Sequence, residues 1–287
     1  MTFDSPSSIA SPTVRSIDYR HLSWAARLVC DYCHDFERLR PFFEGSPLDP
    51  DAWRQAIKAR QANPVNHPQI KAAVMEQLTS RRAPDAALAS AEQLSNPATV
   101  AIVAGQQAGL FGGPLFTLLK GLTAIAVARE VSVKYSVPAV PVFWVHAEDH
   151  DLAEISNCSV LTSDFEFETI TIPHDASSSQ PASAVRLNES IVSTLNRLRE
   201  LLPNTEFSDS VFNQLSNAYQ PGRGIVDAFA LWMDTLLGPH GLVVFDASDT
   251  AVKSIARPLF QQEIDTVGET SRLATESGSD LIAKGYH

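Results

Sequence analysis

Apolar residues follow two kinds of pattern along the chain, and the pattern changes near Asn96. From Leu22 to about Leu94 they recur three and four positions apart, which is the period of a helix with one buried face. Six prolines interrupt the pattern: Pro41, Pro47, Pro50, Pro64, Pro68 and Pro84. Residues 1–95 are therefore predicted to form an N-terminal helical region.

Three short apolar runs with the length of buried strands follow. They are Val100 to Ala104, Pro138 to Val145 and Gly241 to Phe245. A helical stripe from Leu115 to Ala126 separates the first two runs, so they are predicted to be parallel neighbours in a βαβ unit. The fold class is predicted to be α/β, with a Rossmann-like, doubly wound parallel sheet. Residues 96–157 would form its first βαβ unit and 239–287 its continuation, truncated by the end of the chain.

Between the second and third runs lie about 90 residues, far more than the dozen or so that one crossover needs. Phe165 to Ile172 alternates like a half-exposed strand, Ser177 to Ser183 has loop composition, and Leu187 to Leu202 is helical. We assign 158–238 to an α+β insertion.

Charge and hydropathy exclude some classes of function. The formal net charge of -11 argues against a nucleic-acid-binding protein, which needs a basic surface. No apolar run approaches the roughly 18 residues of a membrane helix, and the N-terminus lacks the apolar core of a signal peptide. We expect a cytoplasmic protein with no membrane partner.

The three cysteines are too few for a disulfide framework. Cys30 and Cys33 spell C-x-x-C, which occurs in redox pairs and in half zinc sites, and Cys158 stands apart. Because apolar residues continue at helical spacing through the motif and no second C-x-x-C follows, we favour two thiols on an ordinary helix.

A glycine-rich turn lies between the first strand and the helix after it. Gly105, Gly109, Gly112 and Gly113 stand where free backbone N–H groups and the helix dipole attract anions. Their spacing is not G-x-G-x-x-G, and Lys120-Gly121 reverses the Gly-Lys of a P-loop. Gln106 and Gln107 either bind a polar ligand or tie down the turn, so ligand binding and a purely structural turn both remain open.

A string of ionisable residues, His146-Ala147-Glu148-Asp149-His150-Asp151 with Glu154 beyond it, follows the second strand. Ligands bind at this end of parallel strands in open α/β sheets. His146 and His150 could share a metal, but Ala147 stands where H-E-x-x-H requires Glu, and we assign no metal site. Acid–base catalysis or orientation of an amine or hydroxyl is favoured over the alternative of a solvated loop.

Asp246 ends the third strand, and if that strand neighbours the others it would face the same crevice. A ribose hydroxyl or a substrate amine would suit it there. The alternative is a helix N-cap, a role for which Ser248 and Asp249 compete.

Three segments together resemble one family: GQQAGLFGGP from Gly105, VPVFWVHAEDHDLAEI in part, and GLVVFDASD from Gly241. They are similar to the cysteine-adding enzymes of bacillithiol biosynthesis, the BshC family of cysteine ligases. The resemblance implies a Rossmann-type core with connecting insertions, followed by a coiled coil associated with homodimers. The coiled-coil half is expected to be absent from this chain, so the homodimer is expected of the full-length family members.

The activity implied by the resemblance joins the carboxyl of cysteine to the amine of glucosaminyl-malate, the last step of bacillithiol synthesis. Forming an amide from a free carboxylate is uphill in water, so we expect ATP, with Mg at most accompanying the nucleotide, and activation through an acyl-adenylate. The expected catalytic residues are His150, Asp149 and Glu148. The expected substrate- or nucleotide-binding residues are Gly105, Gln106, Gln107, Gly109, Gly113, Asp151, Glu154 and Asp246. Two rival hypotheses remain: a metal-dependent hydrolase using His146 and His150, and a non-catalytic nucleotide-binding fragment.

Overall fold

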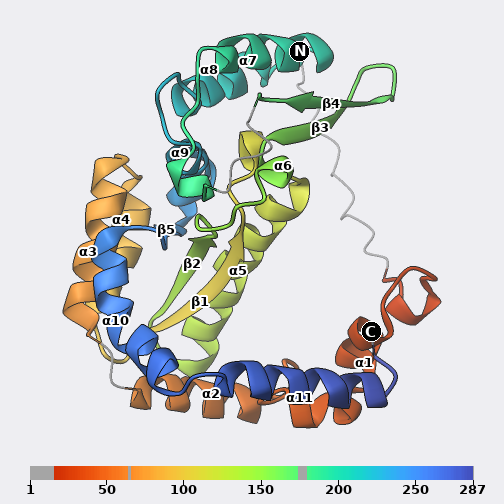
Figure 1. Ribbon diagram of the computed structural model, residues 1–287, viewed down its shortest axis with the longest axis vertical. Helices are drawn as coiled ribbons and strands as arrows, with labels where there is room; N and C mark the ends of the chain where they lie inside the picture. Colours follow the sequence, from red (N-terminus) through yellow and green to blue (C-terminus); the bar gives the residue numbers. More distant parts are fainter. Residues whose placement is uncertain (1–15, 64–65, 174–179, 287) are drawn as a thin grey trace, which may run out of the picture. The chain divides into compact units, whose positions relative to one another are not determined.

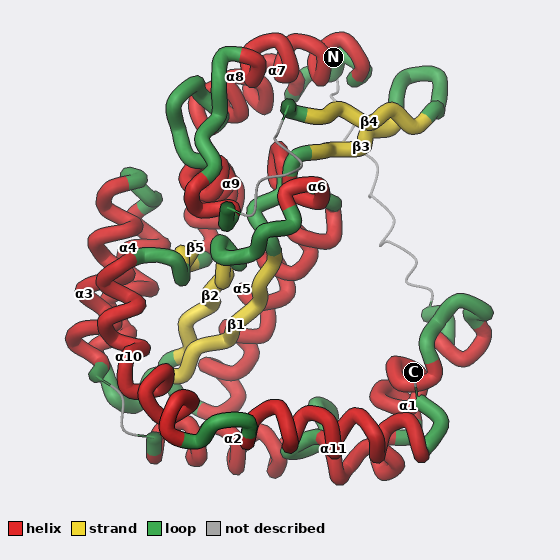
Figure 2. Tube along the Cα trace, in the orientation of Figure 1, coloured by secondary structure: helices red, strands yellow, loops and turns green. Residues whose placement is uncertain are grey.

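The computed structural model describes residues 16–63, 66–173 and 180–286. Its contacts divide the chain into two compact units. The first, here called the helical unit, consists of residues 1–56 and 263–287. The second, the sheet unit, consists of residues 57–262. Figure 2 shows that helices make up most of both units and that the strands belong to the sheet unit.

A three-stranded parallel sheet forms the centre of the sheet unit. Its strands are β1 (Val100–Gln106), β2 (Ala139–Val145) and β5 (Val243–Asp246), in the order β1-β2-β5. Gln106 pairs with Val145, and Val145 with Asp246, so the carboxyl ends of the three strands lie side by side. The predicted α/β class and the parallel pairing of the first two strands are confirmed.

Helices cover both faces of this sheet (Figure 1). The long helix α5 (Leu115–Tyr135) and α9 (Ile225–Leu237) cover one face, burying Phe143, Val145 and Val244. The helices α3 (His67–Ser80) and α4 (Asp85–Glu92) cover the other, burying Val140, Val142 and Val243. Because adjacent residues of β2 enter opposite cores, both kinds of position are apolar, which explains the near-continuous hydrophobic run.

The segment between β2 and α9 adds a hairpin and helices. The short helix α6 (Leu152–Ile155) precedes the antiparallel pair β3 (Asn157–Leu161) and β4 (Phe167–Thr171), and α7 (Ser190–Leu201) and α8 (Ser208–Ala218) follow. The strand predicted at 165–172 and the helix predicted at 187–202 are present, whereas β3 and α8 had not been predicted. Residues 177–179 of the predicted loop lie outside the described residues. The boundaries of the four predicted segments stay a prediction.

Short 3-10 helices connect several elements. They are η1 (Tyr19–His21), η2 (Phe36–Phe42), η3 (Gln93–Ser95), η4 (Leu110–Gly112), η5 (Ala182–Ala184) and η6 (Gly238–His240). Two longer helices, α2 (Pro50–Ala62) and α10 (Thr250–Asp265), each continue from one unit into the other.

The helical unit also contains α1 (Arg27–His34) and α11 (Glu269–Ala283). The Tyr286 hydroxyl donates to Asp31 Oδ2 at 2.8 Å, and the guanidinium of Arg27 lies over the Tyr286 ring. The end of the chain is thereby held to α1. Cys30 and Cys33 both lie on α1 as free thiols, in agreement with the prediction of an ordinary helix.

Candidate functional site

The glycine-rich turn connects β1 to α5 through η4. Three consecutive residues adopt left-handed backbone conformations: Phe111 (φ 56°), Gly112 (φ 101°) and Gly113 (φ 70°). Glycine adopts such φ values without a steric penalty, so Gly112 and Gly113 allow the chain to reverse before the N-cap residue Pro114. The turn therefore places the N-terminus of α5 beside the end of β1.

Two other glycines permit close approach of the backbone. A Cβ atom on Gly105 would lie 2.9 Å from the Trp144 carbonyl oxygen on β2, and one on Gly109 would lie 2.7 Å from Gly113 Cα. Packing within the protein thus accounts for both glycines. Anion binding by the turn, expected from its composition, stays a prediction.

Tyr219 fixes the turn from a distant part of the chain. Its hydroxyl donates to the Gly109 carbonyl at 3.4 Å and accepts from the Gly112 N–H at 3.2 Å. Complete burial raises the pKa of Tyr219 far above its usual value, so the phenol stays neutral and can donate. Its ring also packs edge-on against Phe111. The sequence reasoning had not identified this residue.

The two adjacent glutamines bind different partners. Gln107 Nε2 donates to Asp149 Oδ2 at 2.6 Å and to Glu154 Oε2 at 2.8 Å. Gln106 Oε1 accepts from Lys120 Nζ at 2.7 Å, and Lys120 also donates to the Gly105 carbonyl at 3.1 Å. Gln107 therefore joins the turn to the acidic string, while Gln106 joins it to α5.

Members of the acidic string have distinct environments. Donation from Gln107, followed by backbone N–H groups, holds the pKa of Asp149 below its usual value, so this carboxyl is ionised at neutral pH. Asp151 caps α6 by accepting from the Glu154 N–H at 3.0 Å. Glu148 pairs with Lys253 of α10. His150 is 69% exposed, and its Nδ1 lies 3.9 Å from Asp149 Oδ1.

A cavity of about 260 Å³ lies where the turn meets the hairpin. Five of the predicted site residues line it: Gln106, Gln107, Gly109, Gly113 and Glu154. Cys158 of β3 also lines the cavity, and burial raises the pKa of its thiol. Cys158 could not be recognised as a site residue from the sequence because β3 itself was not predicted.

Other predicted residues lie around this cavity rather than in its lining. Gly105 and His146 line a neighbouring hollow of about 430 Å³ together with Gln106, Gln107 and Trp144. Asp149 is connected to the cavity through Gln107. Among the described residues, no group of three or more His, Cys, Asp or Glu side chains is placed to hold a metal ion.

Asp246 ends β5 next to Val145, at the expected end of the sheet. Its carboxylate accepts from the Ser248 N–H at 2.8 Å and from the Ser248 hydroxyl at 2.7 Å. The side-chain amide of Gln77 donates to the Asp246 carbonyl and accepts from the Asp246 N–H. Burial raises the pKa of this carboxyl. These contacts describe a turn before α10, and a ligand-binding role for Asp246 stays a prediction.

Thr117 is a further candidate that the sequence reasoning missed. It lies in the first turn of α5 and is 1% exposed, and its hydroxyl has no hydrogen-bond partner among the described residues. A Cβ atom on Gly113 would lie 3.3 Å from this hydroxyl. Because buried polar atoms normally have partners, this unpaired hydroxyl beside the glycine turn makes Thr117 a candidate site residue.

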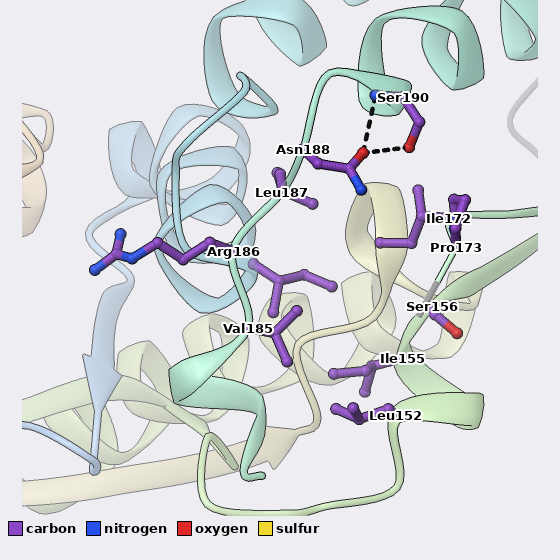
Figure 3. A pocket seen from close by; sticks show the side chains of 11 residues that line it. Leu152, Ile155, Ser156, Ile172, Pro173, Val185, Arg186, Leu187, Asn188 and Ser190 are labelled. Atoms are coloured by element: carbon purple, nitrogen blue, oxygen red, sulfur yellow. Dashed lines mark hydrogen bonds between the residues drawn. The ribbon is translucent and has the colours of Figure 1, made fainter. Parts of the chain in front are cut away.

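A small apolar pocket, shown in Figure 3, lies where α6 packs against the rest of the sheet unit. Leu152, Ile155 and Ile172 meet the segment 185–190 there, and the space of about 30 Å³ is that of one or two water molecules. This pocket anchors α6, which carries Glu154 into the candidate site.

Comparison with known proteins gives the family. The model described as "Bacillithiol biosynthesis BshC, N-terminal Rossmann-like domain" matches residues 13–287. The chain belongs to the BshC family. The predicted family and the predicted Rossmann-like fold are thereby confirmed.

Relatives in the BshC family carry the printed name "Putative cysteine ligase BshC". The protein from Salinibacter ruber is 33% identical over 91% of this chain and 48% of its own length. That from Koribacter versatilis is 32% identical over the same shares. That from Chlorobaculum tepidum is 39% identical over 68% of this chain and 35% of its own length. The chain thus spans about half the length of the first two relatives.

In the described part of this BshC chain, the helices are too short or too polar to cross a membrane. The relatives' printed names describe a putative cysteine ligase, and the family description names bacillithiol biosynthesis.

Proposed function

We propose that the protein joins the carboxyl of cysteine to the amine of glucosaminyl-malate, in the last step of bacillithiol biosynthesis. The supporting observation is the junction of Gln107 with Asp149 and Glu154 at the carboxyl ends of the parallel strands, beside a cavity. Ligands of open α/β sheets bind at this edge. Cytoplasmic location and homodimers of the complete protein belong to the same proposal.

The acidic side of the site suits an amine. Asp149 stays ionised because Gln107 and backbone N–H groups donate to it, and Glu154 lines the cavity. Two carboxylates attract an ammonium group and orient it for attack once it has lost a proton. The proposed acceptor of that proton is the exposed imidazole of His150, whose Nδ1 lies 3.9 Å from Asp149 Oδ1.

The turn side of the site suits an anion. The N-terminus of the 21-residue helix α5 attracts negative charge, and Thr117 has a buried hydroxyl without a partner there. These groups fit a phosphate of ATP or a carboxylate of the malate. ATP, when bound, would supply the free energy for activating the cysteine carboxyl. The chain's own residues would hold the anion, keep the amine close and remove its proton.

The test is a reaction of the complete protein with glucosaminyl-malate, cysteine and ATP, with mass detection of bacillithiol. Asp149→Asn and His150→Ala should each lower product formation at least tenfold, while the exposed His240→Ala should leave it unchanged. A wild-type protein that forms no product would refute the reaction. Full activity of both site variants would refute the roles of Asp149 and His150.

The two rival functions have different outcomes in the same experiment. A metal-dependent hydrolase would contain stoichiometric zinc or manganese, and its activity would require His146 as well as His150. A non-catalytic nucleotide-binding protein would bind ATP and form no product with either substrate. Metal analysis and ATP binding measured beside the ligation assay therefore separate all three functions.

A further inference from the structure

A second polar cavity, of about 910 Å³, lies in the sheet unit apart from the candidate site. Four arginines line it: Arg81, Arg82, Arg186 and Arg223. One carboxylate, that of Asp227, shares the lining, and Asp234 pairs with Arg81 at 2.6 Å. Four positive charges thus share the lining with one negative charge, in a chain whose net charge is -11.

Two of the arginines are fully explained by the fold. Arg81 bridges Asp234 and the Val244 carbonyl, which joins the end of α3 to α9 and β5. Arg223 donates to the carbonyls of Asn217 and Ala218 at the end of α8. These two side chains therefore form a fixed wall of the cavity, in which Asp234 balances the charge of Arg81.

The other two have charged groups available for a ligand. Arg82 is exposed, and its guanidinium has no hydrogen-bond or ion-pair partner within the described part of the chain. Arg186 makes one 3.3 Å contact, to the Gly222 carbonyl. Figure 3 shows its side chain extending away from the apolar pocket that its neighbours line. An isolated antiparallel bridge pairs the backbone of Arg186 with that of Gly224, so Arg186 lies beside the segment that carries Arg223.

The backbone of Arg82 adds an independent observation. It adopts a left-handed conformation (φ 56°) directly after α3, where the Ala83 N–H donates to the Leu78 carbonyl and closes the helix. Glycine is favoured at this position, and a residue with a side chain costs roughly 1 kcal/mol there. This conformation ends α3 and leaves Arg82 in the lining of the cavity.

We propose that this arginine cavity binds a phosphate-bearing small molecule. A guanidinium group can donate two parallel hydrogen bonds to two oxygens of one phosphate. A single phosphate group can also accept from several arginines at once. The cavity has the volume of a nucleotide-sized ligand. It shares no lining residue with the cavity at Gln107, so the ligand is additional to the substrates of the ligation.

The test is calorimetric titration of the protein with inorganic pyrophosphate at low ionic strength. Arg82→Gly removes the guanidinium and suits the left-handed backbone, so it should weaken binding about tenfold without lowering the unfolding midpoint. Arg186→Gln should weaken binding similarly. Arg197→Gln, on α7 outside the cavity, is the matched control and should bind as wild type does. Succinate should bind more weakly than pyrophosphate.

Each result decides the proposal. Loss of pyrophosphate binding in both cavity variants, with a normal control, supports it. Undetectable binding to wild type, or equal binding by all variants, overturns it. Binding that is lost on Thr117→Val but kept in the arginine variants would place the anion at the glycine turn and also overturn it. Stronger binding of succinate would replace phosphate by a dicarboxylate and refute the ligand class.

Discussion

Gln107 Nε2 lies 2.6 Å from Asp149 Oδ2 and donates to it, although 42 positions separate the two residues. The same nitrogen donates to Glu154 at 2.8 Å. One neutral amide therefore holds two carboxylates at the edge of the sheet where β1 and β2 end. This contact converts two separate sequence motifs into one site.

Gln107→Glu should destabilise the sheet unit. It replaces a donor to two carboxylates by a third carboxylate, and both hydrogen bonds are lost. We expect the free energy of unfolding to fall by about 1 kcal/mol at pH 7.5, and by less at pH 4.5, where protonated carboxyls can donate. Urea unfolding at the two pH values measures the difference.

Gln106→Glu is the matched control for that change. Its side-chain oxygen already accepts from Lys120, so a carboxylate there keeps the contact and gains an ion pair. Its effect on stability should be within about 0.5 kcal/mol of zero or favourable. Equal destabilisation by both substitutions would show that the amide of Gln107 has no special role.

Thr117→Val should raise stability while lowering activity. The buried hydroxyl has no partner among the described residues, and a methyl group of the same size removes the cost of burying it. We expect a gain of about 1 kcal/mol in the free energy of unfolding. In the complete protein, bacillithiol formation should fall if the hydroxyl contacts substrate or nucleotide.

Thr123→Val is the control on the same helix. Its exposed hydroxyl donates to the Leu119 carbonyl, so its loss should change stability by no more than about 0.5 kcal/mol and leave activity intact. Lower stability of Thr117→Val, with unchanged product formation, would contradict the assignment of Thr117 to the binding site.

The central sheet was predictable because its sequence signal is local. Val140 to Val145 is apolar at nearly every position since both faces of β2 are buried, and the stripe on α5 identified the crossover helix. The hairpin was only half predictable. In β3, most residues are partly exposed and no alternation of apolar and polar residues marks them, so β4 was recognised without its partner.

The chemistry of the site was less predictable than its position. Sequence reasoning found Gln107 and the acidic string, but could not decide between a ligand-binding and a structural role for the glutamines. The structure shows that Gln107 connects the glycine turn to Asp149 and Glu154 of the acidic string. Tyr219 and Thr117 were missed because a tyrosine 107 residues from Gly112 and a helical threonine carry no motif. Their importance depends on tertiary contacts.

Gly105→Ala should destabilise the sheet, since the added Cβ would lie 2.9 Å from the Trp144 carbonyl oxygen. We expect a loss of about 1–3 kcal/mol, as for overpacked cores, measured by urea unfolding. Gly278→Ala on α11 is the opposite case, because a Cβ there meets nothing within 4 Å. This substitution should raise the free energy of unfolding of α11 by about 0.5–1 kcal/mol. A neutral Gly105→Ala would contradict the close approach of β1 and β2.

Asp234 should make the protein less stable as pH rises. It is 1% exposed, and burial raises its pKa from 3.8 to about 6, an effect larger than the attraction of Arg81. One oxygen, Oδ2, accepts from Arg81, while Oδ1 is buried without a partner among the described residues. Because the folded state holds this proton more tightly than the unfolded state, the stabilisation is full only well below the unfolded pKa of 3.8 and is lost as pH rises through about 6.

Comparison with Asp234→Asn isolates this effect, because asparagine does not titrate. The difference in unfolding free energy, wild type minus variant, should fall by about 2 kcal/mol between pH 4 and pH 7. Asp149→Asn should show the opposite slope, since the pKa of Asp149 is lowered and its contribution appears as pH rises. A difference that stays constant with pH for Asp234→Asn would mean that Arg81 keeps the carboxylate ionised throughout, and that the ion pair outweighs its burial.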